Sequence, residues 1–393
     1  MKGTKKLAAA LLAAAMMMNC AAITSSAAKV KYITYKGTKI ARLKSDGKAY
    51  YIDQKDPKQN SRALNALMKG STERTVVLPQ GDLKLSTGID FGSNKTLIAS
   101  GTNVIQTDPQ KQLVKNPCTK TNYNSLKNVT IDGGTWYITD NEKMLRDTST
   151  IRFNHGQNIT IKNCTVYTNY RSHGIEIIAC RDVDILNCTV KCEGTPVDGR
   201  REEAVQIDIA TAKTAPTCKD DSGKFVAGQT CRNITIDGCT ITGARALVCN
   251  RTDSENNKWR NYMHHNIVVK NCKLTGVTAE GLVLNNVQGF DVINNTIISK
   301  NKDTSTNFSA GLSAMLFGQN REGGTYKNHI RGNTIKGGKM ALLMTAYSGV
   351  SASYGSTSIK NNKLYCRKGA NYAMTARNIS KLSKPGNTTY KWN

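Results

Sequence analysis

The sequence has 393 residues, of which 39% are hydrophobic and only 6% aromatic, and its formal net charge is +27 at pH 7. A basic excess of this size indicates an anionic partner, but no helix-turn-helix, zinc-finger or RNA-recognition pattern is present, so we expect no nucleic acid partner. An acidic polysaccharide or an anionic cell wall fits better, and a generally basic protein with solvated lysines is the alternative. The length allows two ordinary domains or one elongated repeat domain.

Residues 1–28 have the pattern of a secretory signal peptide. Lys2, Lys5 and Lys6 precede an apolar run over residues 7–18, which is followed by small residues. This run is too short to span a membrane, and no later run is long enough for a transmembrane helix. We therefore expect a secreted, extracellular protein without a transmembrane segment, with a net charge of about +24 after removal of the three lysines.

The region after the signal peptide predicts a cap and then a long repeat domain. Residues 29–60 read as short strands with glycine turns, which predicts an N-terminal leader or cap. Residues 61–70, SRALNALMKG, have an N-cap serine, apolar residues at helical spacing and a terminal glycine, which indicates a short amphipathic helix. We expect this helix to cap a repeat domain that extends over residues 61–393.

A corner segment recurs along the chain, in forms such as NVTIDGGT, NITIKNCT, NITIDGCT and NIVVKNCK. Its corner positions, 23 to 51 residues apart, are Gly134, Cys164, Cys188, Cys239, Cys272, Asn295, Asn333 and Asn362. Repeats of this period indicate a solenoid. Between the corners lie segments such as GIEII, AVQID and GLVLN, whose alternating apolar residues are typical of strands with one buried face. The pattern predicts an all-β fold, a single-stranded right-handed parallel β-helix with a short N-terminal capping helix.

The cysteines predict packed free thiols more than disulfides. Four of them occupy the corner position, where adjacent coils bring residues within about 4.8 Å of each other. Cys218 and Cys231 bracket a polar insertion and are the favoured disulfide. No cysteine and histidine spacing suits a zinc site, so we expect no metal there.

Aligning the second segments in register produces columns of side chains on one face of the coils. The position just before each strand reads Ser149, His173, Glu203, Arg245, Glu280, Ser313 and Met340. The first outward position reads Arg152, Glu176, Gln206, Val248, Val283, Leu316 and Leu343. The next outward position reads Asn154, Ile178, Asp208, Asn250, Asn285, Gly318 and Thr345. Ionisable groups concentrate between residues 149 and 285, which predicts a functional face there.

These columns contain the groups that glycoside hydrolysis needs, namely one protonated and one ionised carboxyl. The predicted catalytic residues are Glu203, Asp208, Glu176 and His173, with His173 tuning or orienting Glu203. The predicted substrate-binding residues are Arg152, Arg171, Gln206, Arg245, Asn250 and Glu280. The alternative is a salt-bridge ladder between Glu203 and Arg245 that His173 caps. We expect the remaining histidines, His155, His264, His265 and His329, to lie in loops, turns or at the surface.

Residues 61–363 resemble the pectin-lyase-like right-handed β-helix superfamily, and most closely the polygalacturonases of glycoside hydrolase family 28. Those enzymes carry NTDGI, GDD, GHG and RIK motifs on successive coils. Here RSHGIEI puts His173 at the aspartate of NTDGI, REEAVQI puts Glu202 and Glu203 at the GDD aspartates, and ARALVCN puts Arg245 at the GHG histidine. No counterpart of RIK follows. The resemblance implies a secreted polysaccharide-cleaving enzyme with divergent catalytic motifs.

Two other functions stay open beside hydrolysis. A polysaccharide lyase would use His173 or Arg245 to take the C5 proton of a uronate, with calcium bound by Asp208, Glu176 and Glu203. Apart from this case we expect no cofactor. A noncatalytic β-helix that binds cell-wall polysaccharide would account for the net charge. In each case the expected partner is an anionic polysaccharide, and the expected state is a monomer.

Overall fold

The structure is a computed structural model that describes residues 31–35, 38–42, 49–52, 56–110, 112–118, 122–139, 143, 148–211, 228–249, 260–320 and 325–393. The predicted signal peptide, together with Cys218 and Asn250, lies outside these residues. In the described part of the chain, no helix is both long and apolar enough to cross a membrane.

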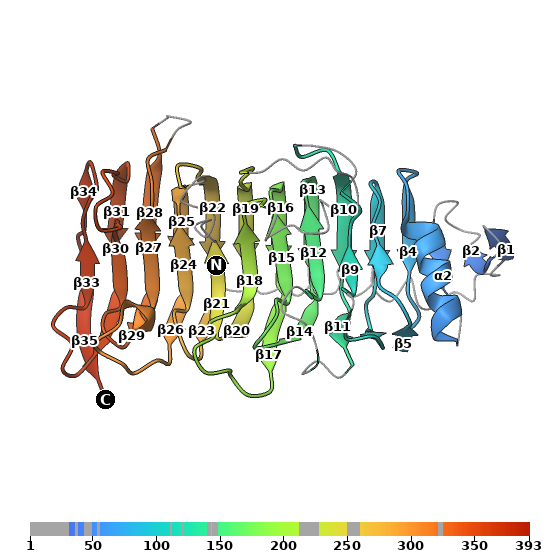
Figure 1. Ribbon diagram of the computed structural model, residues 1–393, viewed down its shortest axis with the longest axis horizontal. Coiled ribbons are helices and arrows are strands. Elements are labelled where there is room, and N and C mark those ends of the chain that lie inside the picture. Colours follow the sequence, from blue (N-terminus) through green and yellow to red (C-terminus); the bar gives the residue numbers. More distant parts are fainter. Residues whose placement is uncertain are drawn as a thin grey trace, which may run out of the picture.

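Three long sheets run side by side along the molecule (Figure 1). Sheet A consists of β1 (Lys31–Tyr35), β2 (Thr38–Arg42), β3 (Ala49–Tyr51), β4 (Arg74–Val77), β7 (Lys95–Ile98), β10 (Leu126–Asp132), β13 (Gly156–Lys162), β16 (Arg181–Leu186), β19 (Arg232–Asp237), β22 (His264–Lys270), β25 (Val287–Ile293), β28 (Lys327–Arg331), β31 (Ser356–Lys360) and β34 (Leu382–Ser383). Sheet B consists of β5 (Gly81–Leu85), β8 (Thr102–Gln106), β11 (Thr135–Ile138), β14 (Thr165–Asn169), β17 (Thr189–Glu193), β20 (Thr240–Gly243), β23 (Lys273–Gly276), β26 (Thr296–Ser299), β29 (Thr334–Gly337), β32 (Lys363–Arg367) and β35 (Thr388–Trp392). Sheet C consists of β6 (Ile89–Asp90), β9 (Val114–Lys115), β12 (Ile151–Asn154), β15 (Ile175–Ile178), β18 (Glu203–Asp208), β21 (Arg245–Cys249), β24 (Leu282–Asn285), β27 (Leu312–Leu316), β30 (Leu342–Ala346) and β33 (Met374–Ala376).

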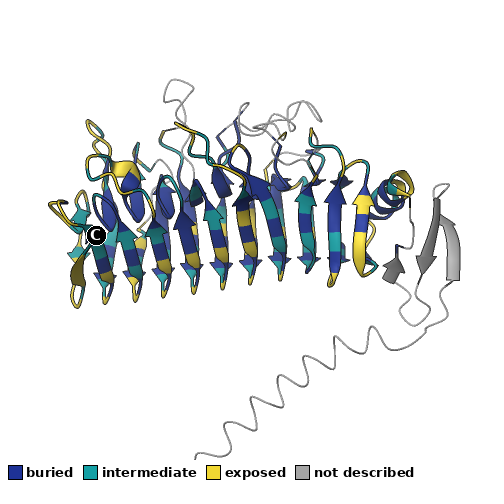
Figure 2. Cartoon of the chain, turned by 90° about the horizontal axis from the view of Figure 1, so that it is seen from below, coloured by how far each residue is buried: buried dark blue, intermediate teal, exposed yellow. Residues whose placement is uncertain are grey.

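Each full coil contributes one strand to each sheet, and the strands of successive coils pair in parallel, as β10, β13 and β16 do in sheet A. Alternate side chains of these strands, such as Val129, Ile131, Ile159 and Ile161, point inward and are buried in one continuous core. Figure 2 shows buried residues repeating along the strands from one end of the stack to the other. The predicted right-handed parallel β-helix is confirmed.

The helix α2 (Pro57–Met68) lies at one end of the stack (Figure 1). Its N-cap is Asp56, five residues before the predicted N-cap Ser61, so the helix begins earlier than expected. The Asp56 side chain accepts a hydrogen bond from the Gln59 N–H at 2.9 Å, and proline occupies the first helical position. The helix buries Leu64 and Leu67 against the first coils, so the prediction of a capping helix is confirmed.

The corner residues form a ladder of hydrogen bonds, as their spacing predicts. The Cys188 N–H donates to Cys239 Sγ at 3.4 Å, and the Cys239 N–H donates to Cys272 Sγ at 3.3 Å. Farther along, the N–H of Cys272 donates to Asn295 Oδ1 at 2.8 Å, and asparagines continue the column. Cysteine and asparagine therefore occupy equivalent positions, in which the side chain accepts from the backbone of the preceding coil.

The thiols in this column are free, as expected, but the predicted bond between Cys218 and Cys231 is wrong. Cys231 is a buried free thiol whose sulfur accepts the N–H of Cys180 at 3.3 Å. It therefore belongs to a packed column inside the coils and not to the edge of an insertion. Among the described cysteines it is Cys118 that is disulfide-bonded.

Substitution of Asn333 by alanine is expected to destabilise the fold by about 2–4 kcal/mol. The Asn333 side chain is 1% exposed, and its Oδ1 accepts the backbone N–H and the amide of Asn295 at 2.8 and 3.0 Å. Its Nδ2 donates to Val292 O at 2.8 Å, so the substitution leaves buried groups of two coils unpaired. Urea denaturation measures the loss, with Asn371→Ala at an exposed position as the control. A loss of less than about 1 kcal/mol would show that the ladder is not a main source of stability.

Two of the four histidines expected in loops, turns or at the surface, His264 and His265, lie elsewhere, whereas His155 occupies a turn and the side chain of His329 is 40% exposed. His264 and His265 are buried at the start of β22, where His265 stacks on Tyr326 with ring centroids 4.5 Å apart. His155 occupies a turn but is fully buried, and its Nδ1 lies 2.9 Å from Asn122 O. His329 lies in β28, half-buried. Packing between neighbouring coils and segments, which the local sequence does not reveal, buries these positions.

Candidate active site

Strand pairing in sheet C brings most of the predicted site residues together. Glu176 lies between Arg152 and Gln206 on adjacent strands, and Asp208 pairs with Ile178. These side chains point to the outer face of the sheet, because they alternate with inward residues of the core. The outward columns predicted for β12, β15 and β18 are confirmed.

The predicted register is wrong in the coil that contains β27. Ser313 pairs with Val283 there, whereas Leu316 was expected in that column. β27 begins at Leu312, which takes the place that the alignment of AMLFG gave to Met315. The whole strand is therefore shifted by three residues. The ionisable cluster lies on earlier strands, so this shift does not disturb it.

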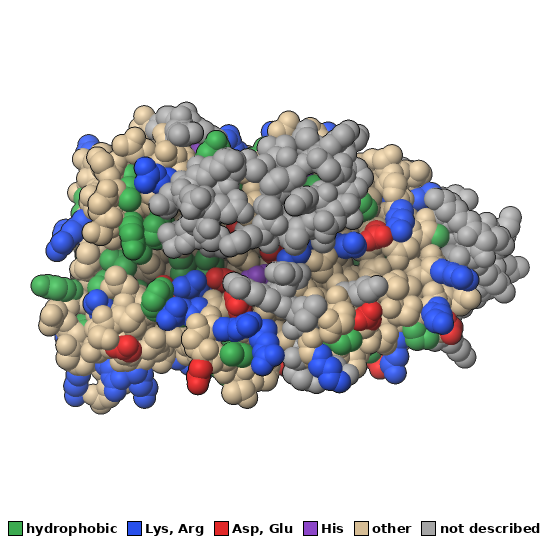
Figure 3. All heavy atoms as spheres, in the orientation of Figure 1, with side chains coloured by type: hydrophobic (Ala, Val, Ile, Leu, Met, Phe, Trp, Pro, Cys, Tyr) green, Lys and Arg blue, Asp and Glu red, His purple; other side chains and the backbone are tan. Residues whose placement is uncertain are grey.

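Charged groups form a ladder along one column of the outer face. Arg245 Nη1 lies 3.3 Å from Glu203 Oε1, and Arg245 Nε lies 2.9 Å from Glu280 Oε2. His173 Nδ1 lies 3.7 Å from Glu203 Oε2. The predicted contact between Glu203 and Arg245 is therefore present, and Glu280 extends it. Figure 3 shows acidic, basic and histidine side chains gathered near the middle of one face of the molecule.

His173 is held in a defined tautomer. Its Nδ1 lies 2.9 Å from the backbone oxygen of Glu203. Because a carbonyl oxygen only accepts, Nδ1 carries a proton, and in the neutral imidazole Nε2 keeps its lone pair. With 11% of its side chain exposed, His173 is slightly more accessible than Glu203, at 8%, and less accessible than Arg245, at 17%. It can therefore take up a proton from a group placed against Nε2.

Glu176 is an ionised carboxylate in a buried position. Its Oε2 accepts hydrogen bonds from Ser149 Oγ and from Arg152 Nε, each at 2.5 Å. Burial by itself would raise the pKa of Glu176, but the charges of Arg152 and His173 and these two hydrogen bonds outweigh it, so the pKa is lowered. This carboxyl therefore keeps its negative charge although it is only 2% exposed.

Asp208 has the opposite character. It is 1% exposed, and burial raises its pKa well above the ordinary value, with the charges of Glu176 and Glu203 raising it further. A hydrogen bond from the Ile209 N–H to Oδ1, at 2.8 Å, opposes the shift without cancelling it. One face of the sheet therefore holds one carboxyl whose pKa is raised and one whose pKa is lowered.

The remaining predicted substrate-binding residues divide into three groups. Gln206 and Glu280 are buried within the cluster. Arg171 is exposed in a turn, where its backbone N–H donates to Asn169 Oδ1 at 2.8 Å, and no described contact joins its side chain to the cluster. Asn250 lies outside the described residues.

An aromatic residue and an arginine that the columns did not include lie beside the cluster. Arg201 Cζ is 3.8 Å from the ring centroid of Phe308, and Arg245 Cζ is 5.7 Å from it. Phe308 belongs to the short helix η2 (Asn307–Ser309) and is 39% exposed. Both residues lie on connections between strands, outside the repeat, so no periodic signal marks them. Together they form an exposed, cationic edge of the site.

The three carboxylates proposed as calcium ligands do not fit that role. Over the residues with described positions, no group of three or more His, Cys, Asp or Glu side chains is placed to hold a metal ion. The Glu176 oxygen that would bind the ion is already hydrogen-bonded to Arg152 and Ser149. Burial also raises the pKa of Asp208, which disfavours the ionised carboxylate that calcium prefers.

Substitution of Asp208 by asparagine is expected to stabilise the protein at neutral pH. A folded-state pKa above the unfolded value means that the folded state binds more protons between the two values, so stability falls as pH rises through that window. Asparagine removes this cost, because it is neutral at every pH. Melting temperatures measured from acidic to neutral pH should therefore fall less in the variant. A variant that is less stable than the wild type at neutral pH would contradict a raised pKa of Asp208.

Comparison with known proteins gives structural likenesses only. No family model matches the chain, and no characterised protein matches its sequence significantly. The A-module of mannuronan C-5 epimerase AlgE6 from Azotobacter vinelandii is 14% identical over 84% of this chain and 95% of its own, with a TM-score of 0.42. The Streptococcus pneumoniae adhesin PfbA is 13% identical over 81% of this chain and 89% of its own, with a TM-score of 0.47. An exopolygalacturonase from Thermotoga maritima is 12% identical over 81% of this chain and 84% of its own, with a TM-score of 0.36. Identities this low concern the fold and assign no activity to this chain.

Proposed function

We propose that this protein cleaves a polysaccharide by glycoside hydrolysis at the outer face of sheet C. The observation that carries the proposal is the raised pKa of Asp208 next to two ion-paired carboxyls, Glu203 with Arg245 and Glu176 with Arg152. Hydrolysis of a glycosidic bond needs one carboxyl that gives a proton and one that is ionised. Burial of several ionisable groups is costly, so a stable fold has no need of such a cluster on its own account.

The proposed roles follow from position and charge. Asp208 gives its proton to the oxygen of the leaving sugar. Glu203, which is paired with Arg245 and lies next to His173, activates the water or attacks the anomeric carbon. The charge of Glu176 keeps the proton on Asp208. His173 orients Glu203 and stabilises its negative charge when it is protonated.

The proposed substrate is an anionic polysaccharide outside the cell. The net charge of +27 attracts such a polymer, and Arg201 and Arg245 provide guanidinium groups for sugar carboxylates at the edge of the cluster. Phe308 contacts Arg201, is 39% exposed and offers an apolar surface on which a sugar ring can stack.

One observation favours a second candidate, the cleavage of a uronate polymer by β-elimination. The Nε2 lone pair of His173 is free to accept the C5 proton of a uronate, while Arg245 holds the sugar carboxylate. No calcium ion enters this version, because the carboxylates do not form a calcium site.

Incubation of the protein with acidic and neutral polysaccharides tests the proposal. New reducing ends without ultraviolet absorbance of an unsaturated uronate indicate hydrolysis, and both signals together indicate elimination. Retention of a polymer without either signal, over a wide range of pH, would instead support a noncatalytic polysaccharide-binding protein and would overturn the proposed activity.

A further inference from the structure

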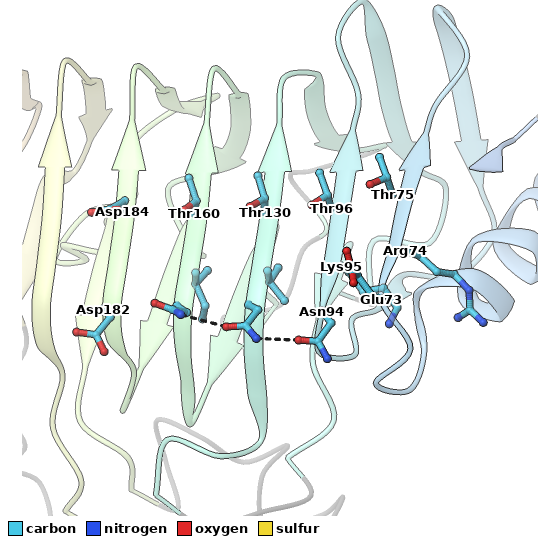
Figure 4. Close-up of a pocket in the computed structure, with 14 residues that line it drawn as sticks. Glu73, Arg74, Thr75, Asn94, Lys95, Thr96, Thr130, Thr160, Asp182 and Asp184 are labelled. Atoms are coloured by element: carbon cyan, nitrogen blue, oxygen red, sulfur yellow. Dashed lines mark hydrogen bonds between the residues drawn. The ribbon is translucent and has the colours of Figure 1, made fainter. Parts of the chain in front are cut away.

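A second surface with binding character lies on sheet A, away from the ionisable cluster. It is a groove of about 580 Å³ on the outer face of β4, β7, β10, β13 and β16. Figure 4 shows that the groove runs across these strands, and therefore along the axis of the stack, with side chains of successive coils projecting into it. A polymer chain laid in this groove would meet the same kind of side chain at each coil.

The floor of the groove carries a row of threonines in register. Thr75, Thr96, Thr130 and Thr160 occupy equivalent positions on successive strands, and Asp184 continues the row. Within the described part of the protein, none of these four hydroxyl groups has a hydrogen-bond partner. The hydroxyls recur at the spacing of neighbouring strands, about 4.8 Å, and remain available to a ligand.

One wall of the groove is a chain of asparagine amides that stops at a carboxylate. Asn128 Nδ2 donates to Asn94 Oδ1 at 2.8 Å, and Asn158 Nδ2 donates to Asn128 Oδ1 at 3.0 Å (Figure 4). The next residue in the row is Asp182, which has no proton to give, and its Oδ1 accepts from Asn233. Asn158 Oδ1 therefore accepts no hydrogen bond from the described residues.

The positive charges that line the groove are used inside the protein. The ammonium group of Lys95 donates to the backbone oxygens of Gly70, Thr72 and Ser93, at 3.0, 2.5 and 2.8 Å. Arg74 Nη1 donates to Leu67 O at 3.1 Å. The carboxylates of Asp182 and Asp184, by contrast, are exposed. The groove therefore presents mainly acceptors and hydroxyl groups to a ligand, although Arg181 pairs with Asp182 at its edge, with N and O 3.6 Å apart.

We propose that this groove is a second carbohydrate site, which binds a neutral, hydroxyl-rich glycan chain along the stack of coils. Sugar hydroxyls donate to Asn158 Oδ1 and to the carboxylates of Asp182 and Asp184, and exchange hydrogen bonds with the threonine row. The ligand differs in charge from the proposed substrate of sheet C. The site would attach the protein to a neutral polymer while the other face acts on an acidic one.

Binding of neutral cello-, xylo- and manno-oligosaccharides to the full chain tests the proposal by titration calorimetry. We expect at least one of them to bind, and the double variant Thr130→Val/Thr160→Val to bind it at least about tenfold more weakly, because two hydrogen bonds are lost. Valine keeps the branched shape of threonine, so the strands should fold as before, which thermal melting verifies.

The matched control is Thr165→Val/Thr189→Val, which removes the equivalent pair from a threonine row on sheet B. It should bind as the wild type does. Three results would each overturn the proposal. The first is that no neutral probe binds, and the second is that the wild type and the sheet A variant bind with equal affinity. The third is that oligogalacturonate binds in this groove more tightly than the neutral probes do. Because Glu203→Gln should leave groove binding unchanged, failure of this site and failure of the proposed hydrolysis can be told apart.

Discussion

Glu203→Gln, Asp208→Asn and His173→Ala are each expected to lower the rate of polysaccharide cleavage by at least about tenfold, the lower end expected for acid and base groups. Glutamine cannot act as a base or nucleophile at position 203, and asparagine has no proton of suitable acidity at position 208. Alanine at position 173 removes the imidazole beside Glu203. Initial rates of reducing-end release, at a fixed pH and with saturating substrate, measure the three losses.

Glu202→Gln is the matched control for these variants. Glu202 precedes Glu203 directly, but it lies before the first residue of β18, is only half-buried and has no role in the proposed reaction. It should keep the wild-type rate within about twofold. If all three site variants are as active as the control, the reaction does not take place at this cluster.

Arg152→Met is expected to cost about 3–5 kcal/mol of folding stability, the range found when one partner of a buried ion pair is removed. Glu176 would keep Ser149 as a hydrogen-bond donor but would lose the guanidinium that holds its charge. The pKa of Glu176 would then rise. The folding stability of the variant would therefore fall with increasing pH, in a range where the wild type stays stable. Urea denaturation at neutral pH measures the loss.

The double variant Arg152→Met/Glu176→Gln separates charge from packing. It removes both charges, so most of the stability should return. Arg181→Met is the surface control, because its ion pair with Asp182 is exposed, with N and O 3.6 Å apart, and should contribute about 0–1 kcal/mol. A single variant as stable as this control would mean that the pair of Arg152 and Glu176 does not support the fold.

The fold follows from the sequence because a parallel β-helix repeats the same local requirements in every coil. Corner positions need a side chain that accepts from the preceding coil, and cysteine or asparagine at Cys272 and Asn295 meets this need in the same way. Inward positions need apolar residues at every second place. Helix α2 lies outside the repeat, and its start depends on the Asp56 cap, which the apolar spacing did not indicate.

The site could be predicted as a set of columns but not as a set of chemical states. Strand register carries Arg152, Glu176 and Gln206 to neighbouring places, so spacing in the sequence is enough to bring them together. Whether a carboxyl is ionised depends on burial and on the direction of donors such as Ser149 Oγ, which periodicity does not contain. For the same reason the calcium hypothesis arose from the residue types and is not supported by their arrangement.

The groove on sheet A had no signal in the sequence. Thr96, Thr130 and Thr160 read as ordinary polar positions of alternating strands, because threonine is common in sheets. Their significance lies in hydroxyls without partners and in the step from Asn158 to Asp182, where the amide chain stops. Both features require the coordinates of side chains on neighbouring coils.

The most direct test of the proposed active site is a crystal structure of Glu203→Gln with an oligosaccharide of the polymer that the wild type cleaves. We expect the sugar chain to lie over sheet C, with a glycosidic oxygen within hydrogen-bond distance of Asp208 and a sugar carboxylate at Arg201 or Arg245. An oligosaccharide bound only at another face of the β-helix would contradict the assignment.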